Sequence, residues 1–245
     1  MSFDILTLNL WSINEPLEAR YCALEAGLKR LRPDIICLQE VWCDPRSGRS
    51  QRELVAQMCN LAHSFEEDGL AVVCSSAVVR STSVALPEFT GDGRRQALLV
   101  QFEIENRLVM VTNAHLAYPP EMTWERKKQA EVLLAEIKQN RSKGMAVILC
   151  GDLNDVPESP AIRAILDSDQ QFRDVFSACC PNNPGVTYSR RNHYVDPSWS
   201  LDERIDYIFT SCDLTAHACS VVFDGANGLD LVSDHFGVFC NVTFR

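Results

Sequence analysis

The stretch Cys150-Gly151-Asp152-Leu153-Asn154-Asp155 has the composition expected where a buried strand ends in an α/β protein. It follows an unbroken apolar run, residues 145–150, whose length is typical of a strand buried on both faces. The chain then turns at a glycine and presents two carboxylates and an amide. Ser159 and Pro160 favour the start of a helix just beyond. An ordinary Asn/Asp turn without chemistry has the same composition, so the stretch alone leaves both readings open.

Apolar segments of strand length recur along the chain, some separated by helical patterns and others in succession, which predicts a mixed α/β chain. Helices are expected from Asn14, as N-cap, to residue 31, and over 50–61, 123–139 and 159–166. Strands are expected over 3–10, 34–38, 71–74, 78–86, 97–104, 108–112, 145–150, 204–209, 214–223 and 236–244. Residues 168–203 are the least regular part. No repeat or linker is visible, so we expect one α/β domain over residues 1–245.

The composition is that of an ordinary globular protein, with 46% hydrophobic and 23% charged residues. The 11 cysteines are an odd number without C-x₂-C spacing, and several lie in apolar runs. They predict free thiols in a reducing compartment, and hence a cytoplasmic protein, rather than disulfides or a zinc site. The strand-like start at Phe3–Leu8 leads us to expect no signal peptide, and no apolar run is long enough for a membrane span. No obligate protein partner is visible.

The net charge of −10 repels polyanions at long range. It argues against a processive DNA-binding protein, although a local basic patch could still bind nucleic acid. Acidic metal ligands would account for part of this charge.

Polar residues stand at or beside the ends of several apolar segments. They are Asn9, Glu40, His115, Asp152, Asn154, Asp206, Asp234 and His235. Asp206 lies between Ile205 and Tyr207 inside a predicted strand, where an unpaired carboxylate is costly. Two carboxylates about 4 Å apart repel by roughly 4 kcal/mol at an effective dielectric near 20. Four could gather only around a cation or a protonated histidine.

Carboxylates and amides are hard oxygen donors, which favours Mg²⁺ or Mn²⁺ over Zn²⁺. The matching chemistry is metal-assisted attack of water on a phosphoester, with a carboxylate orienting the water and a histidine moving protons or stabilising charge. Each residue also has a structural explanation when taken singly. Asn9 and Asn113 could be turn residues, the histidines could be hydrogen-bonded core residues, and Arg204 could neutralise Asp206.

Six motifs in a fixed order resemble the endonuclease/exonuclease/phosphatase superfamily over about residues 3–244. They are Thr7-Leu8-Asn9-Leu10-Trp11, Leu38-Gln39-Glu40-Val41-Trp42, Asn113-Ala114-His115, Gly151-Asp152-Leu153-Asn154, Arg204-Ile205-Asp206-Tyr207 and Ser233-Asp234-His235-Phe236-Gly237. The resemblance implies a four-layer α/β sandwich, in which two mixed β-sheets pack face to face with helices outside. It also implies a Mg²⁺-dependent enzyme that hydrolyses a phosphodiester, with Mn²⁺ as a possible substitute.

The resemblance also implies roles for the motif residues. Glu40 would be the principal metal ligand with Asn9 beside it, and Asp234 would complete a second metal position. Asp152 would orient or deprotonate the attacking water, and Asn154 would hold a phosphate oxygen. Asp206 would fix the tautomer of His235. His235 and His115 would be the catalytic histidines, and their acid and base roles stay unassigned. Arg95 and Asn113 would contact the substrate phosphate.

Two departures narrow the branch of the superfamily. Abasic-site endonucleases carry an acidic residue where this chain has Trp11, and they lack a histidine at the position of His115. The motifs around Glu40 and His115 are closer to bacterial members and to neutral sphingomyelinases. The run Arg190-Arg191-Asn192-His193-Tyr194 sets cations beside aromatic residues, which suits phosphate-rich ligands but also an ordinary polar loop.

The sequence therefore predicts a phosphodiesterase acting on nucleic acid, lipid or a small molecule. A sphingomyelinase-like lipid phosphodiesterase and an inositol-type phosphomonoesterase are the alternatives among enzymes. The monoesterase needs a basic pocket, which the acidic composition makes less favourable. A catalytically silent binding module on the same fold is the alternative from another class, although every motif residue is present.

Overall fold

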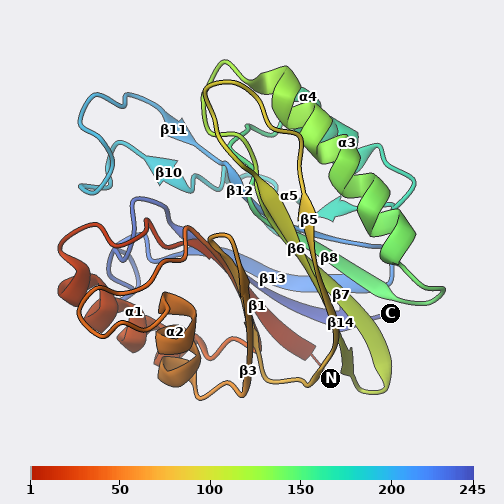
Figure 1. The fold of residues 1–245 in the computed structure, drawn as a ribbon, viewed down its shortest axis with the longest axis horizontal. Coiled ribbons are helices and arrows are strands. Elements are labelled where there is room, and N and C mark those ends of the chain that lie inside the picture. The colour runs from red at the N-terminus through yellow and green to blue at the C-terminus, as the bar shows by residue number, and fades with distance from the viewer. Residues whose placement is uncertain (1) are drawn as a thin grey trace.

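Two strands lie at the centre of the fold, β1 (Ser2–Asn9) and β8 (Ala146–Asp152), and each belongs to a different six-stranded sheet. The computed structural model describes residues 2–245. β8 is buried along its whole length, as its unbroken apolar run predicts. The two mixed sheets pack face to face with helices outside, so the predicted four-layer sandwich is confirmed (Figure 1).

The first sheet has the strand order β13-β14-β1-β2-β4-β3, in which only β1 and β2 run parallel. Its other strands are β2 (Ile35–Gln39), β3 (His63–Glu67), β4 (Leu70–Cys74), β13 (Leu214–Val222) and β14 (Gly237–Phe244). Its outer face is covered by α1 (Leu17–Leu31) and α2 (Gln51–Cys59). Leu24 and Leu28 of α1 and Val55 of α2 pack there against Leu6 and Leu8 of β1.

The second sheet has the order β5-β6-β7-β8-β12-β9, in which only β7 and β8 run parallel. Its other strands are β5 (Val78–Ala85), β6 (Gln96–Ile104), β7 (Arg107–His115), β9 (Arg173–Asp174) and β12 (Asp206–Thr210). The outer face is covered by α3 (Thr123–Asn140) and α4 (Pro160–Leu166). As predicted, Ser159 caps α4 by accepting a hydrogen bond from the Ile162 amide.

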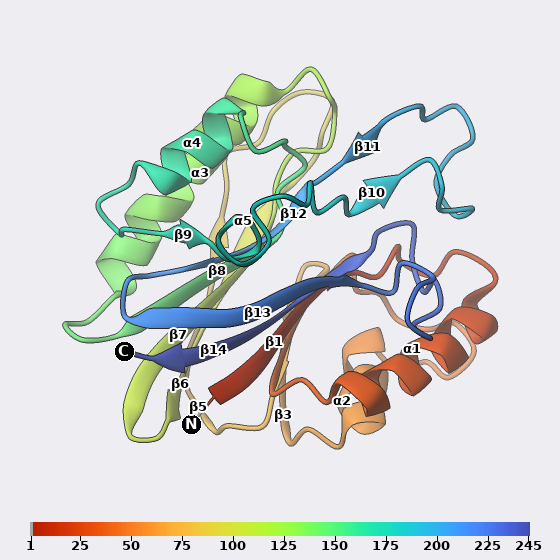
Figure 2. The same cartoon turned by 180° about the vertical axis from the view of Figure 1, so that it is seen from behind.

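The remaining elements are α5 (Val175–Cys179) and a short pair of strands, β10 (Tyr188–Ser189) and β11 (Asp202–Glu203). Figure 2 shows this pair projecting at the end of the sandwich that lies away from both termini. A single apolar layer fills the space between the sheets and includes Ile5, Cys37, Val111 and Ile148. The strands β1, β2, β7 and β8 therefore share one rigid core and deliver their last residues to the same end of the molecule.

Two local details differ from the expectations. Asn14 does not cap α1, because its side chain donates to Trp11 O while the Glu15 carboxylate accepts from the Leu17 amide. The helix begins at Leu17, after Pro16. The edge strand β3 was missed, since its half-buried polar sequence lacks a clear apolar alternation.

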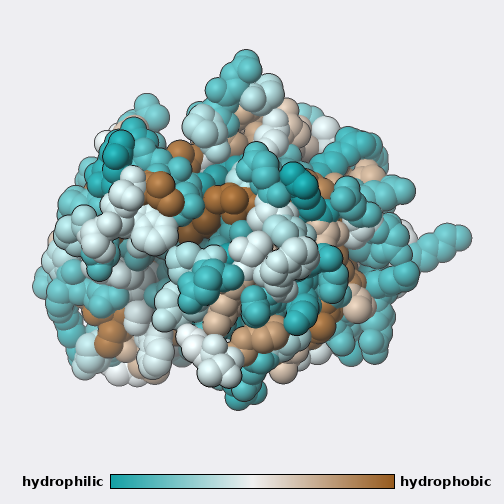
Figure 3. Space-filling view, turned by 90° about the horizontal axis from the view of Figure 1, so that it is seen from above, coloured by the Kyte–Doolittle hydropathy of each residue, from teal (hydrophilic) through white to brown (hydrophobic). Residues whose placement is uncertain are grey.

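None of the helices within residues 2–245 is long and apolar enough to cross a membrane. Figure 3 shows one face of the molecule, on which hydrophilic residues dominate and strongly hydrophobic residues gather mainly in a small central group.

Candidate active site

Strand register places three of the predicted residues in one row. In the second sheet, His115 of β7 pairs with Asp152 of β8, and Asp152 pairs in turn with Asp206 of β12. Directly paired residues point to the same face of a sheet, so these three side chains lie side by side. Gly151 permits this close pairing, because its φ is +137° and a Cβ there would lie 1.9 Å from Ala114 O.

The first sheet contributes the opposite wall through Asn9 and Glu40. The Asn9 side-chain nitrogen donates to Glu40 Oε1 at 3.1 Å and to Asp152 Oδ2 at 3.0 Å. Glu40 follows β2 with a φ of +52°, an uncommon conformation for a residue with a side chain. Asn9 thus joins a carboxylate of each sheet across the end of the sandwich.

Asn9 presents its amide nitrogen, not its oxygen, to these carboxylates. Its Oδ1 accepts a hydrogen bond from the Trp11 amide at 2.9 Å. An amide nitrogen does not ligate Mg²⁺, which takes oxygen ligands. The predicted role of Asn9 as a metal ligand would therefore require its amide group to turn over.

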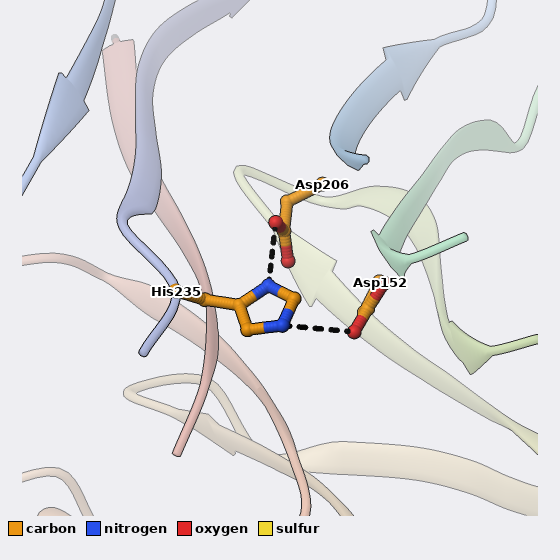
Figure 4. A group of neighbouring side chains, drawn as sticks. All are labelled: Asp152, Asp206 and His235. Atoms are coloured by element: carbon orange, nitrogen blue, oxygen red, sulfur yellow. Dashed lines mark hydrogen bonds and ion pairs between the residues drawn. The ribbon is translucent and has the colours of Figure 1, made fainter. Parts of the chain in front are cut away.

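His235 lies between two of the carboxylates in the row (Figure 4). Its Nδ1 is 2.9 Å from Asp206 Oδ2, and its Nε2 is 3.6 Å from Asp152 Oδ2. Burial alone would lower the pKa of His235, but the charges of Asp206 and Asp152 outweigh burial and raise it well above the usual range. This imidazole is therefore held as a cation near neutral pH.

The second histidine has the opposite electrostatic environment. His115 Nε2 lies 3.5 Å from Asp152 Oδ2, yet burial lowers the pKa of His115 to about 4. Arg95 and His235 add to the lowering. Two histidines that face one carboxylate thus have pKa values driven apart, which is a common arrangement for an acid and base pair.

Asp234 marks an excess of negative charge beside Glu40. Burial is the largest cause and raises the pKa of Asp234 to about 6. The charge of His235 lowers this pKa, while the charges of Glu40 and Asp152 raise it. Hard oxygen donors gathered under such repulsion fit a divalent cation, which would relieve it. Glu40 and Asp234, which line the same cleft, could supply such donors.

Asp152, Asp206 and His235 also lie close enough together to hold a metal ion. However, His235 Nδ1 and Asp206 Oδ2 already share a hydrogen bond, and a protonated imidazole repels a cation. The hydrogen bond suits this group to proton handling, and Glu40 and Asp234 supply further oxygen donors in the same cleft.

Asn154 and Arg95 lie at the margins of the site. Asn154 lines the same cleft as His235, and its backbone amide donates to Asp152 Oδ1 at 3.0 Å, which fixes that carboxylate. Arg95 lines the cleft on the other side of Glu40 but is paired with Asp92, with Nη2 at 2.6 Å from Oδ1. Its predicted contact with phosphate would compete with this ion pair.

The predicted contact between Asn113 and substrate phosphate was wrong. Asn113 is fully buried between the sheets. Its side chain donates to Leu38 O and Ala71 O and accepts from Gln39 Nε2 at 2.6 Å. All of these partners are protein groups behind the site, so the amide has no group left for substrate. Through them Asn113 links β7, which ends at His115, to β2, which ends just before Glu40.

Arg204 does not neutralise Asp206 either. Its Nη1 lies 2.7 Å from Asp174 Oδ2, in a separate buried pair. Within residues 2–245, the recorded partner of the Asp206 carboxylate is His235, and Asp206 Oδ1 is buried without a hydrogen bond.

Two clefts meet at Glu40 and His115, and their volumes are about 510 and 890 Å³. Sequence reasoning missed several of their wall residues, including Tyr118, Tyr188 and Leu201. The Tyr188 ring lies 4.8 Å from the His235 ring. These residues come from loops and from a two-residue strand that carry no periodic signal.

The cations that line these clefts, among the residues described, are all engaged with carboxylates. Arg94 and Arg95 pair with Asp68 and Asp92. Arg126 pairs with Asp155 and also donates to Ala117 O and Pro119 O, which fixes the loop after His115. The clefts therefore lack a free basic clamp.

Comparisons with known proteins identify the family that this chain matches and the structures that share its fold. A family model described as Endonuclease/Exonuclease/phosphatase family matches residues 6–235. Protein angel homolog 1 of Homo sapiens is 28% identical over 209 residues, covering 70% of this chain and 31% of that protein. The chain thus spans about a third of the length of this curated relative.

Solved structures share the fold at low sequence identity. D. rerio TDP2 complexed with a single-strand DNA product gives a TM-score of 0.83 at 19% identity, covering 99% of each chain. The human Nocturnin catalytic domain with bound sulfate gives a TM-score of 0.76 at 20% identity, covering 100% of this chain and 94% of that chain. These likenesses establish the fold alone.

Proposed function

The chain belongs to the endonuclease/exonuclease/phosphatase family, and from this membership we propose that it is a divalent-metal-dependent phosphodiesterase. The observation that carries the proposal is the meeting of His115, Asp152 and His235 at one end of the sandwich, beside Glu40 and Asp234. Such a set can position water, move a proton and stabilise charge on a phosphate within one cleft.

Asp152 is the side chain best placed to orient the attacking water. Both its oxygens are fixed, Oδ1 by the Asn154 amide and Oδ2 by Asn9, and both histidines face it. Water held at Asp152 would therefore have a defined direction of approach.

His235 would stabilise negative charge on the phosphate or deliver a proton to the leaving oxygen. Asp206 orients the imidazole ring, because Nδ1 donates to Asp206 while Nε2 faces Asp152 and the cleft. His115, neutral near pH 7, would serve as a hydrogen-bonding group or as a proton acceptor.

We propose Mg²⁺ as the cation, with Mn²⁺ as a substitute, because the available donors are carboxylate oxygens. Glu40 and Asp234 would hold it. When bound, the cation would act as a Lewis acid toward a phosphate oxygen.

The paired state of Arg94, Arg95 and Arg126 favours a phosphodiester over a phosphomonoester. A monoester dianion needs more positive charge than a diester monoanion, and these clefts supply little beyond the cation and His235. Nucleic acid, as in the complex of the TDP2 relative, and a lipid or small diester both fit this proposal.

The test compares hydrolysis of bis-p-nitrophenyl phosphate and p-nitrophenyl phosphate with Mg²⁺, Mn²⁺ or EDTA. We expect metal-dependent cleavage that favours the diester, lost in Asp152→Asn and kept in Asp167→Asn, a matched change at an exposed position. Preference for the monoester would contradict the diesterase proposal, and the absence of any metal-stimulated hydrolysis would favour a silent binding module.

Salt dependence then separates the classes of diester. Cleavage of a DNA or RNA strand should weaken steeply with salt, because binding a polyanion releases counterions. Cleavage of a small or lipid diester should change little over the same range.

A further inference from the structure

The irregular segment before β12 contacts both sides of the Asp206–His235 pair. Asn192, in the run of arginines and aromatics noted in the sequence, is only 2% exposed. Its side-chain nitrogen donates to Ser233 O at 2.8 Å and to Asp234 O at 2.9 Å. These are the carbonyl groups of the two residues that immediately precede His235.

We propose that Asn192 is a positioning residue that sets the place of the His235 imidazole. This inference rests on the proposed function only where activity is measured, since the geometry of His235 can be observed without turnover. An amide that holds both preceding carbonyls fixes the orientation of the peptide that leads into His235.

Asn192 is itself held rigidly enough to do this. Its side-chain Oδ1 accepts from the Tyr194 backbone amide at 3.1 Å, and its backbone amide donates to Ser189 O at 2.9 Å. Both side-chain hydrogens point at the loop before β14, so the residue has no donor left for substrate.

Thr187 connects the same segment to the other member of the pair. Its hydroxyl is fully buried and accepts from the backbone amides of Ile205 and Asp206, each at 3.1 Å. Its carbonyl accepts from the Phe236 amide at 2.7 Å. Residues 187–192 thus form a bracket, which touches the backbone beside Asp206 through Thr187 and the backbone before His235 through Asn192.

The bracket explains how residues from different sheets meet accurately. Asp206 begins β12 of the second sheet, whereas His235 precedes β14 of the first. No strand ladder joins these two elements, since they belong to different sheets. Within residues 2–245, hydrogen bonds from residues 187–192 supply a connection close to both side chains.

The test uses Asn192→Asp, which keeps the volume and the acceptor for the Tyr194 amide but replaces the donors by an oxygen that faces two carbonyls. Thr187→Val removes the second contact at nearly constant volume. Asn182→Ala, at an exposed position in the same segment, is the control. Asn192→Ala serves if the aspartate variant fails to fold.

Two readouts separate positioning from general stability. On bis-p-nitrophenyl phosphate, kcat should fall about 10- to 100-fold with KM changed less than about twofold, as expected for a misplaced catalytic group. By NMR, the Nδ1–H resonance of His235, assigned with His235→Ala, should shift or broaden in both bracket variants and stay unchanged in the control.

The proposal is overturned if the folded Asn192 variant keeps the wild-type imidazole resonance, whatever its thermal stability. If the wild-type protein hydrolyses the diester, an unchanged kcat in the Asn192 variant would also overturn the proposal. If the wild-type protein hydrolyses no diester, the proposed function fails while the NMR comparison still decides the role of Asn192.

Discussion

His235 Nδ1 lies 2.9 Å from Asp206 Oδ2, and this contact joins the loop before β14 of one sheet to the first residue of β12 in the other. Because the carboxylate accepts from Nδ1, it both orients the imidazole ring and favours its protonated form.

Asp206→Asn keeps the shape of the side chain but removes the charge that most raises the pKa of His235. We expect kcat on a diester to fall on the order of 10²- to 10⁴-fold, because both the orientation and the charge of the imidazole are disturbed. NMR titration of metal-free protein should show a lower His235 pKa. A variant with the wild-type pKa would contradict the assigned pairing.

Because the pKa of Asp234 is raised to about 6, we expect the stabilisation of the protein by a bound metal ion to depend on pH. Its folded pKa of about 6 lies above its unfolded value, so its contribution to stability is present at low pH and is lost as pH rises through about 6. A bound cation offsets this loss only when the carboxylate is ionised. Mg²⁺ should therefore raise Tm more at pH 7.5 than at pH 5, as measured by thermal shift.

Asp234→Asn is the comparison for that experiment, because it removes the titrating group. Its Mg²⁺-induced rise in Tm should be smaller and nearly independent of pH. If Mg²⁺ raises the Tm of the wild-type protein equally at both pH values, Asp234 does not lie beside the cation.

His115 should act as a neutral group, since burial lowers its pKa to about 4. We expect His115→Asn, which can still hydrogen bond, to retain about tenfold more activity than His115→Ala. The ratio of the two kcat values at pH 7 provides the measurement. Equal loss in both variants would mean that the imidazole moves a proton.

The same lowered pKa has a consequence for stability. The unfolded chain binds a proton at His115 near pH 6.5, while the folded chain resists it until about pH 4. His115 therefore lowers the stability of the metal-free protein as pH falls from about 6.5 to 4. Urea unfolding should show a smaller change over this range in His115→Asn.

Asn113→Ala should destabilise the protein without changing substrate affinity. It leaves the carbonyls of Leu38 and Ala71 and the amide of Gln39 without their buried partner, which costs about 1–3 kcal/mol. Urea unfolding measures the loss, with Asn182→Ala as an exposed control. A raised KM for bis-p-nitrophenyl phosphate at unchanged stability would instead support a contact between Asn113 and the substrate.

The sequence by itself determined one α/β domain and its site motifs, because their signals are local, and the resemblance carried by those motifs implied the sandwich. The apolar run before Gly151, the alternation of strands with helices, and polar residues at strand ends all depend on neighbours in the chain. The six ordered motifs added the family, which the match over residues 6–235 confirms.

Only the tertiary structure decided what each polar residue faces. Asn113 and His115 are two residues apart on β7, yet one is saturated between the sheets and the other faces the site. No local pattern distinguishes an amide that binds backbone carbonyls from one that faces a substrate.

The charge states of the histidines were likewise set by packing. His115 and His235 both lie beside strand ends, but burial dominates at His115 and two buried carboxylates dominate at His235. The same holds for Asn192, whose partners Ser233 and Asp234 lie about forty residues away in the chain. Desolvation and long-range pairing depend on the folded surroundings, which the linear sequence does not display.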